Sequence, residues 1–225
     1  MSAATGVERF EESARLSQGQ SDRAIYETVA NALARREVAG ELLLDVGCGG
    51  GRLWQHLRGR YERCVGVDLI RYEELPSEVE FKRAELNHEP VPLPDACADA
   101  VVAVETIEHL ENPRAFIREL TRLARPGGWV VVTTPNQQSF LSLLTLVVKG
   151  RFSAFQDAHY PAHLTALLEI DLRRIAAECG LAEVDVVYTG FGRVVLTPFH
   201  YPRALSRLAP RLCSDNLVLL GRRRA

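Results

Sequence analysis

The chain has 225 residues, of which 47% are hydrophobic and 25% are charged, and its formal net charge is −2. This length suits one α/β domain over residues 1–225, and the apolar content excludes a wholly disordered chain. A net charge so close to zero excludes a general electrostatic attraction to nucleic acid or to anionic lipid. The local basic run Arg222-Arg223-Arg224 is expected to be a solvated C-terminal tail.

Cysteine usage and hydropathy bear on the compartment. The five cysteines are widely spaced and contain no Cys-x-x-Cys pair, which predicts reduced thiols and no zinc site. The first residues lack the apolar stretch of a signal peptide. The longest apolar run, 140–148, is about half as long as a bilayer span. These features predict a cytoplasmic protein.

The predicted elements begin with an N-terminal helical extension over residues 1–38. Ser21 and Asp22 offer an N-cap, and apolar residues recur at helical spacing from there to Gly40. Beyond Gly40, apolar runs bounded by glycine and proline alternate with amphipathic stretches, and this alternation predicts a parallel sheet covered on both faces. The predicted strands are 41–46, 63–68, 79–84, 99–105, 129–134, 183–189 and 216–220, and the predicted helices are 52–60, 112–125 (capped by Asn112) and 169–179 (ended by Gly180).

The strongest motif is the segment LLLDVGCGGG, in which Asp45 precedes Gly47, Gly49 and Gly51. Glycines at the end of a buried strand allow a tight turn and let a ligand lie against bare peptide at a helix N-terminus. A dinucleotide fingerprint would need its third glycine at position 52, which is Arg52. The spacing therefore argues against a nicotinamide-dependent oxidoreductase.

This loop resembles that of the class I S-adenosylmethionine-dependent methyltransferases, and the resemblance covers nearly the whole chain. In that family, Asp45 and the three glycines would wrap the methionine part of the cofactor. Asp68 matches the acid that ends the second strand, whose carboxylate accepts hydrogen bonds from both ribose hydroxyls. Leu69 would flank the adenine.

Two further stretches extend the resemblance. Glu85 and Leu86 match an acidic turn that faces the adenine amino group, although the family usually has an aspartate there. Residues 93–113 and 125–136 resemble the family's fourth and fifth strands. The resemblance implies a seven-stranded, mostly parallel sheet with helices on both faces and the last strand antiparallel. Each signal alone has a structural explanation as a turn or a strand-end cap, but four in order match one fold.

The Glu-x-x-Glu-His string after the fourth strand is the candidate reaction site. Methyl transfer requires that the acceptor be aligned with the methyl group, that water be excluded and, for some acceptors, that a proton be removed from the acceptor. His109, with an unperturbed pKa of about 6.5, is the predicted general base, and Glu105 is predicted to lie beside the cofactor. The alternative is structural: Glu105 caps the loop, and His109 hydrogen-bonds backbone at a helix end.

The same string has a metal-binding interpretation. Glu105, Glu108 and His109, with a later histidine such as His159 or His163, resemble the metal set of small-RNA 2′-O-methyltransferases. Ubiquinone-pathway O-methyltransferases have a similar string. Carboxylates and imidazoles hold a divalent ion that polarises hydroxyls. The lack of a basic surplus and of an RNA-binding domain argues against nucleic acid as the acceptor.

Residues 135–167 form the predicted substrate lid or insertion. Apolar residues surround the helix over 140–148 almost completely, so this helix is buried, covers the acceptor site, or meets lipid. Peripheral membrane contact is expected through residues 139–152. Tyr160 and the two histidines are candidates for the acceptor pocket or for loop contacts.

We expect methyl transfer from S-adenosylmethionine to a small or lipid-like acceptor, at oxygen because of the likeness to the ubiquinone-type group. An oxidoreductase is further disfavoured because Leu164 stands where a Tyr-x-x-x-Lys pair beginning at Tyr160 would need lysine. A non-catalytic S-adenosylmethionine-binding regulatory protein stays open, and so does a metal-dependent RNA 2′-O-methyltransferase. The acceptor, the metal and the oligomeric state are also open.

Overall fold

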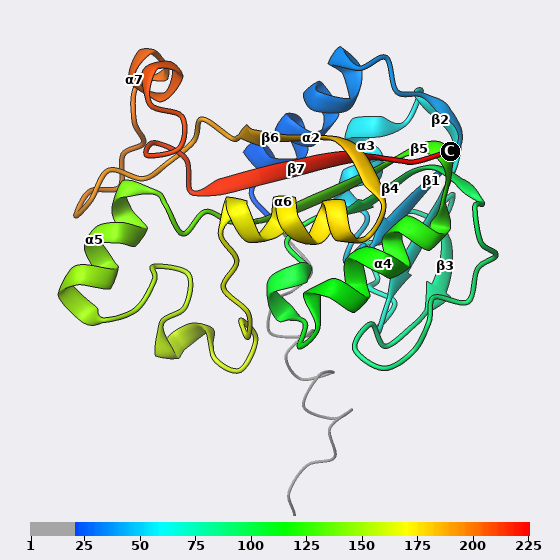
Figure 1. Ribbon diagram of the computed structural model, residues 1–225, viewed down its shortest axis with the longest axis horizontal. Coiled ribbons are helices and arrows are strands. Elements are labelled where there is room, and N and C mark those ends of the chain that lie inside the picture. Colours follow the sequence, from blue (N-terminus) through cyan, green and yellow to red (C-terminus); the bar gives the residue numbers. More distant parts are fainter. Residues whose placement is uncertain (1–20) are drawn as a thin grey trace, which may run out of the picture.

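The computed structural model describes residues 21–225, so the first part of the 1–38 extension lies outside the described residues. These residues form one seven-stranded sheet with the order β3-β2-β1-β4-β5-β7-β6 (Figure 1). All neighbours are parallel except β7, which runs antiparallel to both β5 and β6. The expected fold class is confirmed. The strands are β1 Gly40–Val46, β2 Tyr61–Asp68, β3 Glu80–Arg83, β4 Ala98–Ala103, β5 Ala124–Pro135, β6 Leu181–Tyr188 and β7 Asn216–Arg223.

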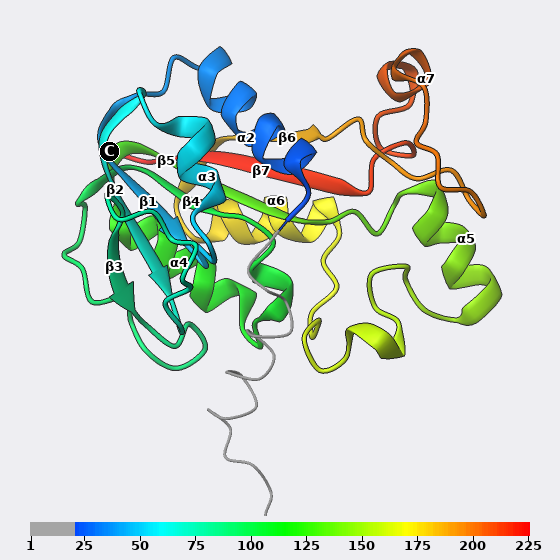
Figure 2. The same ribbon diagram turned by 180° about the vertical axis from the view of Figure 1, so that it is seen from behind.

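Helices cover both faces of the sheet, as Figures 1 and 2 show from opposite sides. Successive side chains of a buried strand point to opposite faces, so Leu43 and Leu44 of β1 join different clusters. Leu44 packs with α4 and α6, whereas Leu43 packs with α2 and α3. The helices are α2 Arg23–Arg35, α3 Arg52–Leu57, α4 Pro113–Leu123, α5 Phe140–Lys149, α6 Glu169–Glu178 and α7 Arg203–Leu208, with 3-10 turns η1 Ile107–His109 and η2 Asp157–His159.

The predicted helix caps are confirmed. Asp22 accepts a hydrogen bond from the backbone N–H of Ala24 at 2.9 Å, and Asn112 accepts one from Ala115 at 3.0 Å. Each satisfies an N–H that has no partner within its helix. Gly180, with a φ of 90°, follows the end of α6.

Two of the element boundaries that differ from the prediction have a local reason. Helix α3 ends at Leu57 because Arg58 leaves the helical conformation, with a ψ of 137°, and bridges to Tyr61. Strand β5 begins at Ala124 because that residue already pairs with Ala98, and a register shift then absorbs the intervening glycines. The sequence pattern also did not predict α7, a helix of two turns.

The expectation of a solvated arginine tail is wrong. Arg222 and Arg223 belong to β7, which continues along β5 beyond its apolar part. Arg222 pairs with Glu183 at 3.2 Å, and the guanidinium of Arg223 donates to the carbonyl of Arg122 at 2.9 Å. These contacts connect the end of β7 to β6 and to the end of α4.

Two further observations concern the compartment. All five cysteines are unpaired thiols, and Cys48, Cys64 and Cys213 are buried. Within residues 21–225, no helix has both the length and the apolar character needed to cross a membrane.

Candidate active site

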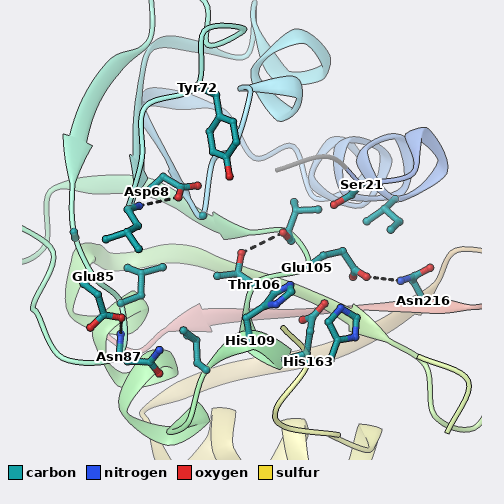
Figure 3. A pocket seen from close by; sticks show the side chains of 18 of the residues that line it. Ser21, Asp68, Tyr72, Glu85, Asn87, Glu105, Thr106, His109, His163 and Asn216 are labelled. Carbon is teal, nitrogen blue, oxygen red and sulfur yellow. Dashed lines mark hydrogen bonds between the residues drawn. The ribbon is translucent and has the colours of Figure 1, made fainter. Parts of the chain in front are cut away.

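The candidate active site is a cavity of about 460 Å³ at the carboxyl ends of β1, β2 and β4 (Figure 3). Cavities of this size accept small organic ligands and cofactors. Asp45, near the end of β1, and Gly49 and Gly51, in the loop after it, lie outside the lining formed by the described residues. The predicted site residues that do line the cavity are Gly47, Asp68, Leu69, Glu85, Leu86, Glu105 and His109.

The loop after β1 requires its glycines. Gly47, Gly49 and Gly51 have φ values of 79°, 48° and 72°, a region that side chains disfavour. A Cβ on Gly47 would also fall 2.2 Å from the hydroxyl oxygen of Thr106. Bare peptide therefore forms this wall of the cavity.

Asp68, at the end of β2, holds the glycine loop in place. Its Oδ2 accepts from the N–H of Gly49 at 2.9 Å, and its Oδ1 accepts from the N–H of Leu69 at 2.7 Å. Burial raises the pKa of Asp68, and these backbone donors oppose the rise. The backbone of Ile70 is a third donor to this carboxylate, which has about four lone-pair sites, so acceptor capacity is left for a ligand hydroxyl.

Glu85 lines the opposite end of the cavity with its carboxylate turned to local partners. Its Oε1 accepts from the N–H of Asn87 at 3.0 Å, and its Oε2 contacts the imidazole of His88. Leu69, next to Asp68, and Leu86, next to Glu85, add apolar side chains to the lining. The contact of Glu85 with an adenine amino group stays a prediction.

Glu105 sits in the centre of the cavity, on a backbone with a φ of 49°. Its Oε1 accepts from the hydroxyl of Thr133 at 2.8 Å, and its Oε2 accepts from the side-chain amide of Asn216 at 2.7 Å. Burial raises the pKa of Glu105 to about 7, although both hydrogen bonds lower it. The surrounding strands thus hold a buried carboxyl group whose pKa is raised.

Three predicted residues meet at the floor of the cavity. One ligand atom each from Glu108, His109 and His163 lies within 4.8 Å of the others. The imidazoles of His109 and His163 meet edge to face at 4.8 Å between centroids. Of the other two candidates, Glu105 is outside this trio, and the ring of His159 stacks on that of His163 at 5.4 Å between centroids.

The two imidazoles are oriented by backbone carbonyls. Nδ1 of His109 donates to Ala162 at 2.8 Å, and Nδ1 of His163 donates to Ala154 at 2.7 Å. A carbonyl oxygen only accepts, so each Nδ1 carries the proton and each Nε2 keeps a lone pair. A backbone carbonyl on the second nitrogen is a common arrangement for metal-binding histidines.

The electrostatics of the trio favour neutral imidazoles beside an orphaned carboxyl group. Burial lowers the pKa of His109, and burial with the neighbouring His109 lowers the pKa of His163 to about 4. Glu108 is fully buried, and no hydrogen bond of ordinary geometry reaches its oxygens from the described residues, although the hydroxyl of Thr134 lies near enough to lower its pKa. Burial, and then the charge of Glu105, raises the pKa of Glu108 well above its usual range.

Some residues that line or support the cavity were not predicted from the sequence. Tyr72 stands above Asp68 in Figure 3, in a loop without a motif. Thr133 and Asn216 contact Glu105 from β5 and β7, and only the strand order shows that they are neighbours. Thr106, whose hydroxyl donates to the carbonyl of Val46 at 3.3 Å, reads in sequence as an ordinary residue of the fourth-strand motif.

The lid segment reaches the cavity through its second half. Pro161 and His163 line the cavity, whereas none of the residues of α5 does. In α5 only Ser142 is buried, so this helix faces outward. That residues 135–167 cover an acceptor stays a prediction. Within this segment, only residues after 156 line the cavity and could do so.

Known proteins resemble this chain in sequence and in fold. Residues 44–132 match the model of a family described as "Methyltransferase domain". A protein of Mycolicibacterium smegmatis, named "Probable S-adenosylmethionine-dependent methyltransferase", is 32% identical over 178 residues, 73% of this chain and 66% of its own. A "Ubiquinone biosynthesis O-methyltransferase" of Thiobacillus denitrificans is 30% identical over 65% of this chain and 67% of its own. The chain spans 51 to 67% of the length of the first three curated relatives.

The solved structures agree on the fold. A crystal structure of a "SAM dependent methyltransferase" from Archaeoglobus fulgidus superposes with a TM-score of 0.63 over 97% of this chain and all of its own, at 17% identity. The chain belongs to the class I S-adenosylmethionine-dependent methyltransferases. Membership implies S-adenosylmethionine as the cofactor.

The cavity fits that cofactor. The bare peptide at Gly47 leaves room that a Cβ would fill, and the carboxylate of Asp68 keeps acceptor capacity beside its backbone donors. Leu69 and Leu86 offer apolar contacts for a flat base, and Glu105 offers a carboxyl group for a cationic end.

Proposed function

We propose that this chain transfers the methyl group of S-adenosylmethionine to a hydroxyl of a small or lipid-like acceptor. One observation carries the proposal: a single cavity joins the glycine loop and Asp68 to the imidazoles of His109 and His163. The first pair suits the cofactor, and the imidazoles suit a hydroxyl that must lose a proton. The names of the ubiquinone-type relatives support oxygen as the acceptor atom. The five unpaired thiols suit the cytoplasm.

The binding roles follow from the lining. Asp68 would accept both ribose hydroxyls on its remaining lone pairs, and the peptide at Gly47 would lie against the methionine part. Leu69 and Leu86 would contact the adenine. Bound S-adenosylmethionine supplies an electrophilic methyl carbon on a sulfonium, and alignment against that carbon accounts for much of the rate in such a displacement.

His109 is the residue that we assign to the proton. Bound S-adenosylmethionine would supply the methyl group to the acceptor oxygen, and Nε2 of His109 would accept the proton that this hydroxyl loses. That nitrogen is available because Nδ1 donates to Ala162, and the lowered pKa of His109 keeps the ring neutral before the transfer. General base catalysis of this kind contributes about 10²- to 10⁴-fold.

The orphaned carboxyl group of Glu108 favours a second version, in which a divalent cation assists. Glu108, His109 and His163 would hold the ion through a carboxylate oxygen and two Nε2 atoms. A bound cation supplies Lewis acidity to an acceptor hydroxyl, and a negative ligand plus two neutral imidazoles suit a divalent ion. In this version His109 is a ligand rather than a base.

The alternatives have less support. A cavity that extends past Glu105 to polar side chains leaves room for an acceptor, which a purely cofactor-binding regulator would not need. An RNA acceptor would call for a positive surface around the cavity, and the formal net charge of the chain is −2.

The test uses S-adenosylmethionine with an isotopic label in its methyl group, mixed with metabolite and lipid extracts. We expect a labelled product whose methyl is bound to oxygen. His109→Gln should lower labelling by about 10²-fold while cofactor affinity is kept, and His200→Gln, outside the cavity, is the matched control. A product methylated at nitrogen or carbon, or cofactor binding without any product, would contradict the proposal.

A further inference from the structure

We propose that a lobe formed by residues 139–156 and 189–214 docks this protein on an anionic lipid surface. The docking lobe contains α5 and α7, which lie at the same end of the molecule in both opposite views (Figures 1 and 2). Docking does not require methyl transfer, so a protein that fails to dock could still have the proposed function.

The two segments of the docking lobe are joined to each other. The N–H of Phe140, the first residue of α5, donates to the carbonyl of Leu212 at 2.9 Å. The side-chain amide of Asn136 donates to the carbonyls of Arg211 and Ser214 at 2.7 and 2.8 Å. The start of α5 is therefore fixed against the end of the second segment.

The docking lobe carries most of the exposed apolar surface. Among the described residues, twelve of the fifteen exposed large hydrophobic side chains belong to it. Val147 and Val148 at the end of α5 are 83% and 71% exposed, and Leu196 is fully exposed. Exposed apolar side chains concentrated in two neighbouring segments point to an interaction site rather than to random exposure.

Charge in the docking lobe has one sign. The two segments contain no aspartate or glutamate, although the chain has 29. Lys149, Arg203 and Arg207 are exposed and form no ion pair with the described residues. The cationic residues of the lobe are Lys149, Arg151, Arg193, Arg203, Arg207 and Arg211.

This combination fits a membrane better than a second copy of the chain. Arg151, Arg193 and Arg211 already form ion pairs with acids beside the lobe. Pairing two lobes would still bring together Lys149, Arg203 and Arg207 of each copy, for which the described residues provide no ion pair. An anionic bilayer instead offers hydrocarbon for Val147 and Val148 and phosphate for Lys149, which follows them directly. Long basic side chains reach the headgroups while their neighbours insert.

The docking lobe also borders the active site. Phe191, Arg193 and His200 line a smaller cavity of about 260 Å³. Asp22, Ile25 and Asn216 line both that cavity and the larger one. A docked molecule would thus hold its reaction cavity beside the membrane, which suits a lipid-like acceptor; this last point rests on the proposed function.

The test is sedimentation of the full chain with vesicles of phosphatidylcholine alone or mixed with an equal amount of phosphatidylglycerol. We expect binding to the mixed vesicles, weaker binding at high salt, and little binding to phosphatidylcholine alone. Val147→Ser with Val148→Ser should lower the partition coefficient at least tenfold, and Arg203→Gln with Arg207→Gln about tenfold.

Matched controls lie outside the docking lobe. Ile170→Ser changes a side chain that is 48% exposed, and Arg114→Gln with Arg118→Gln removes the same charge from α4. Both should bind like wild type. The proposal is overturned if wild type binds neither vesicle, or if the lobe variants bind like the controls. It is also overturned if wild type is a dimer that the valine variant converts to a monomer without vesicle binding.

Discussion

The side-chain amide of Asn216 donates to Oε2 of Glu105 at 2.7 Å, although 111 positions separate the two residues. The bond ties the start of β7 to the centre of the cavity, so the antiparallel end of the sheet takes part in the site. We expect Asn216→Ala to lower the free energy of unfolding by about 1–3 kcal/mol, because Glu105 keeps only Thr133 as a partner. Urea denaturation measures this, and the exposed Gln55→Ala should show almost no change. Equal stabilities would mean that the bond contributes nothing.

Gly47 can be tested against a glycine that differs only in its surroundings. Gly47 and Gly59 both have positive φ, at 79° and 91°, but a Cβ would strike Thr106 only at Gly47, since nothing lies within 4 Å of it at Gly59. Gly59→Ala should cost about 1 kcal/mol from backbone strain alone, and Gly47→Ala clearly more. Only Gly47→Ala should also weaken cofactor binding. Similar losses in both variants would show that the loop can relax around the added methyl group.

The raised pKa of Asp45 predicts that the stability of the protein depends on pH. Burial first, and then the charge of Asp68, raises the pKa of Asp45 to about 8, whereas in the unfolded chain it titrates near 3.8. Between these values the folded state holds a proton that the unfolded state has lost, so stability falls as pH rises through this window and levels off above it. Asp45→Asn should therefore gain stability relative to wild type between pH 5 and pH 8, by about 1 kcal/mol or more.

The measurement for Asp45 is chemical denaturation of the ligand-free protein at several pH values. The exposed Asp95→Asn makes the same chemical change elsewhere and should show a smaller trend. If the difference between Asp45→Asn and wild type does not change with pH, the aspartate is ionised in the folded protein.

A test of divalent cation binding distinguishes the version with His109 as general base from the version with a bound metal ion. Calorimetric titration of Mn²⁺ should show a site that is weakened at least about tenfold by His163→Ala and is unaffected by His200→Ala. Glu108→Gln should weaken the same site, because it removes the only negative ligand. Absence of binding at millimolar Mn²⁺, with methyl transfer indifferent to a chelator, would leave His109 as a base and exclude the metal version.

The sequence indicated those parts of the structure that depend on local chemistry. Asp22 and Asn112 cap their helices as predicted, since a cap acts within three residues. The glycine loop and Asp68 were recognised because their spacing is constrained by a single turn and strand. Helix α3 was predicted too long because its pattern continues past Arg58, where pairing with Tyr61 ends the helix.

The long-range part of the site was not predictable in the same way. Thr133 reaches Glu105 because β5 lies beside β4, and Asn216 reaches it because β7 pairs antiparallel with β5; no local pattern encodes either pairing. The sequence pointed to four ligands for a metal, but backbone contacts of the loop bring together only Glu108, His109 and His163. Arg222 and Arg223 looked like a tail because a strand that ends in polar residues has no apolar alternation.

Calorimetric titration of S-adenosylmethionine and of NAD⁺ tests the central claim most directly. The wild-type protein should bind S-adenosylmethionine and not NAD⁺, and Asp68→Ala should lower the affinity at least tenfold, because two charge-assisted hydrogen bonds are each worth about 1.5–3 kcal/mol. Asp68→Asn should lose less, since its remaining oxygen can still accept. Tight binding of NAD⁺ without binding of S-adenosylmethionine, or an affinity for S-adenosylmethionine that Asp68→Ala leaves unchanged, would contradict the account.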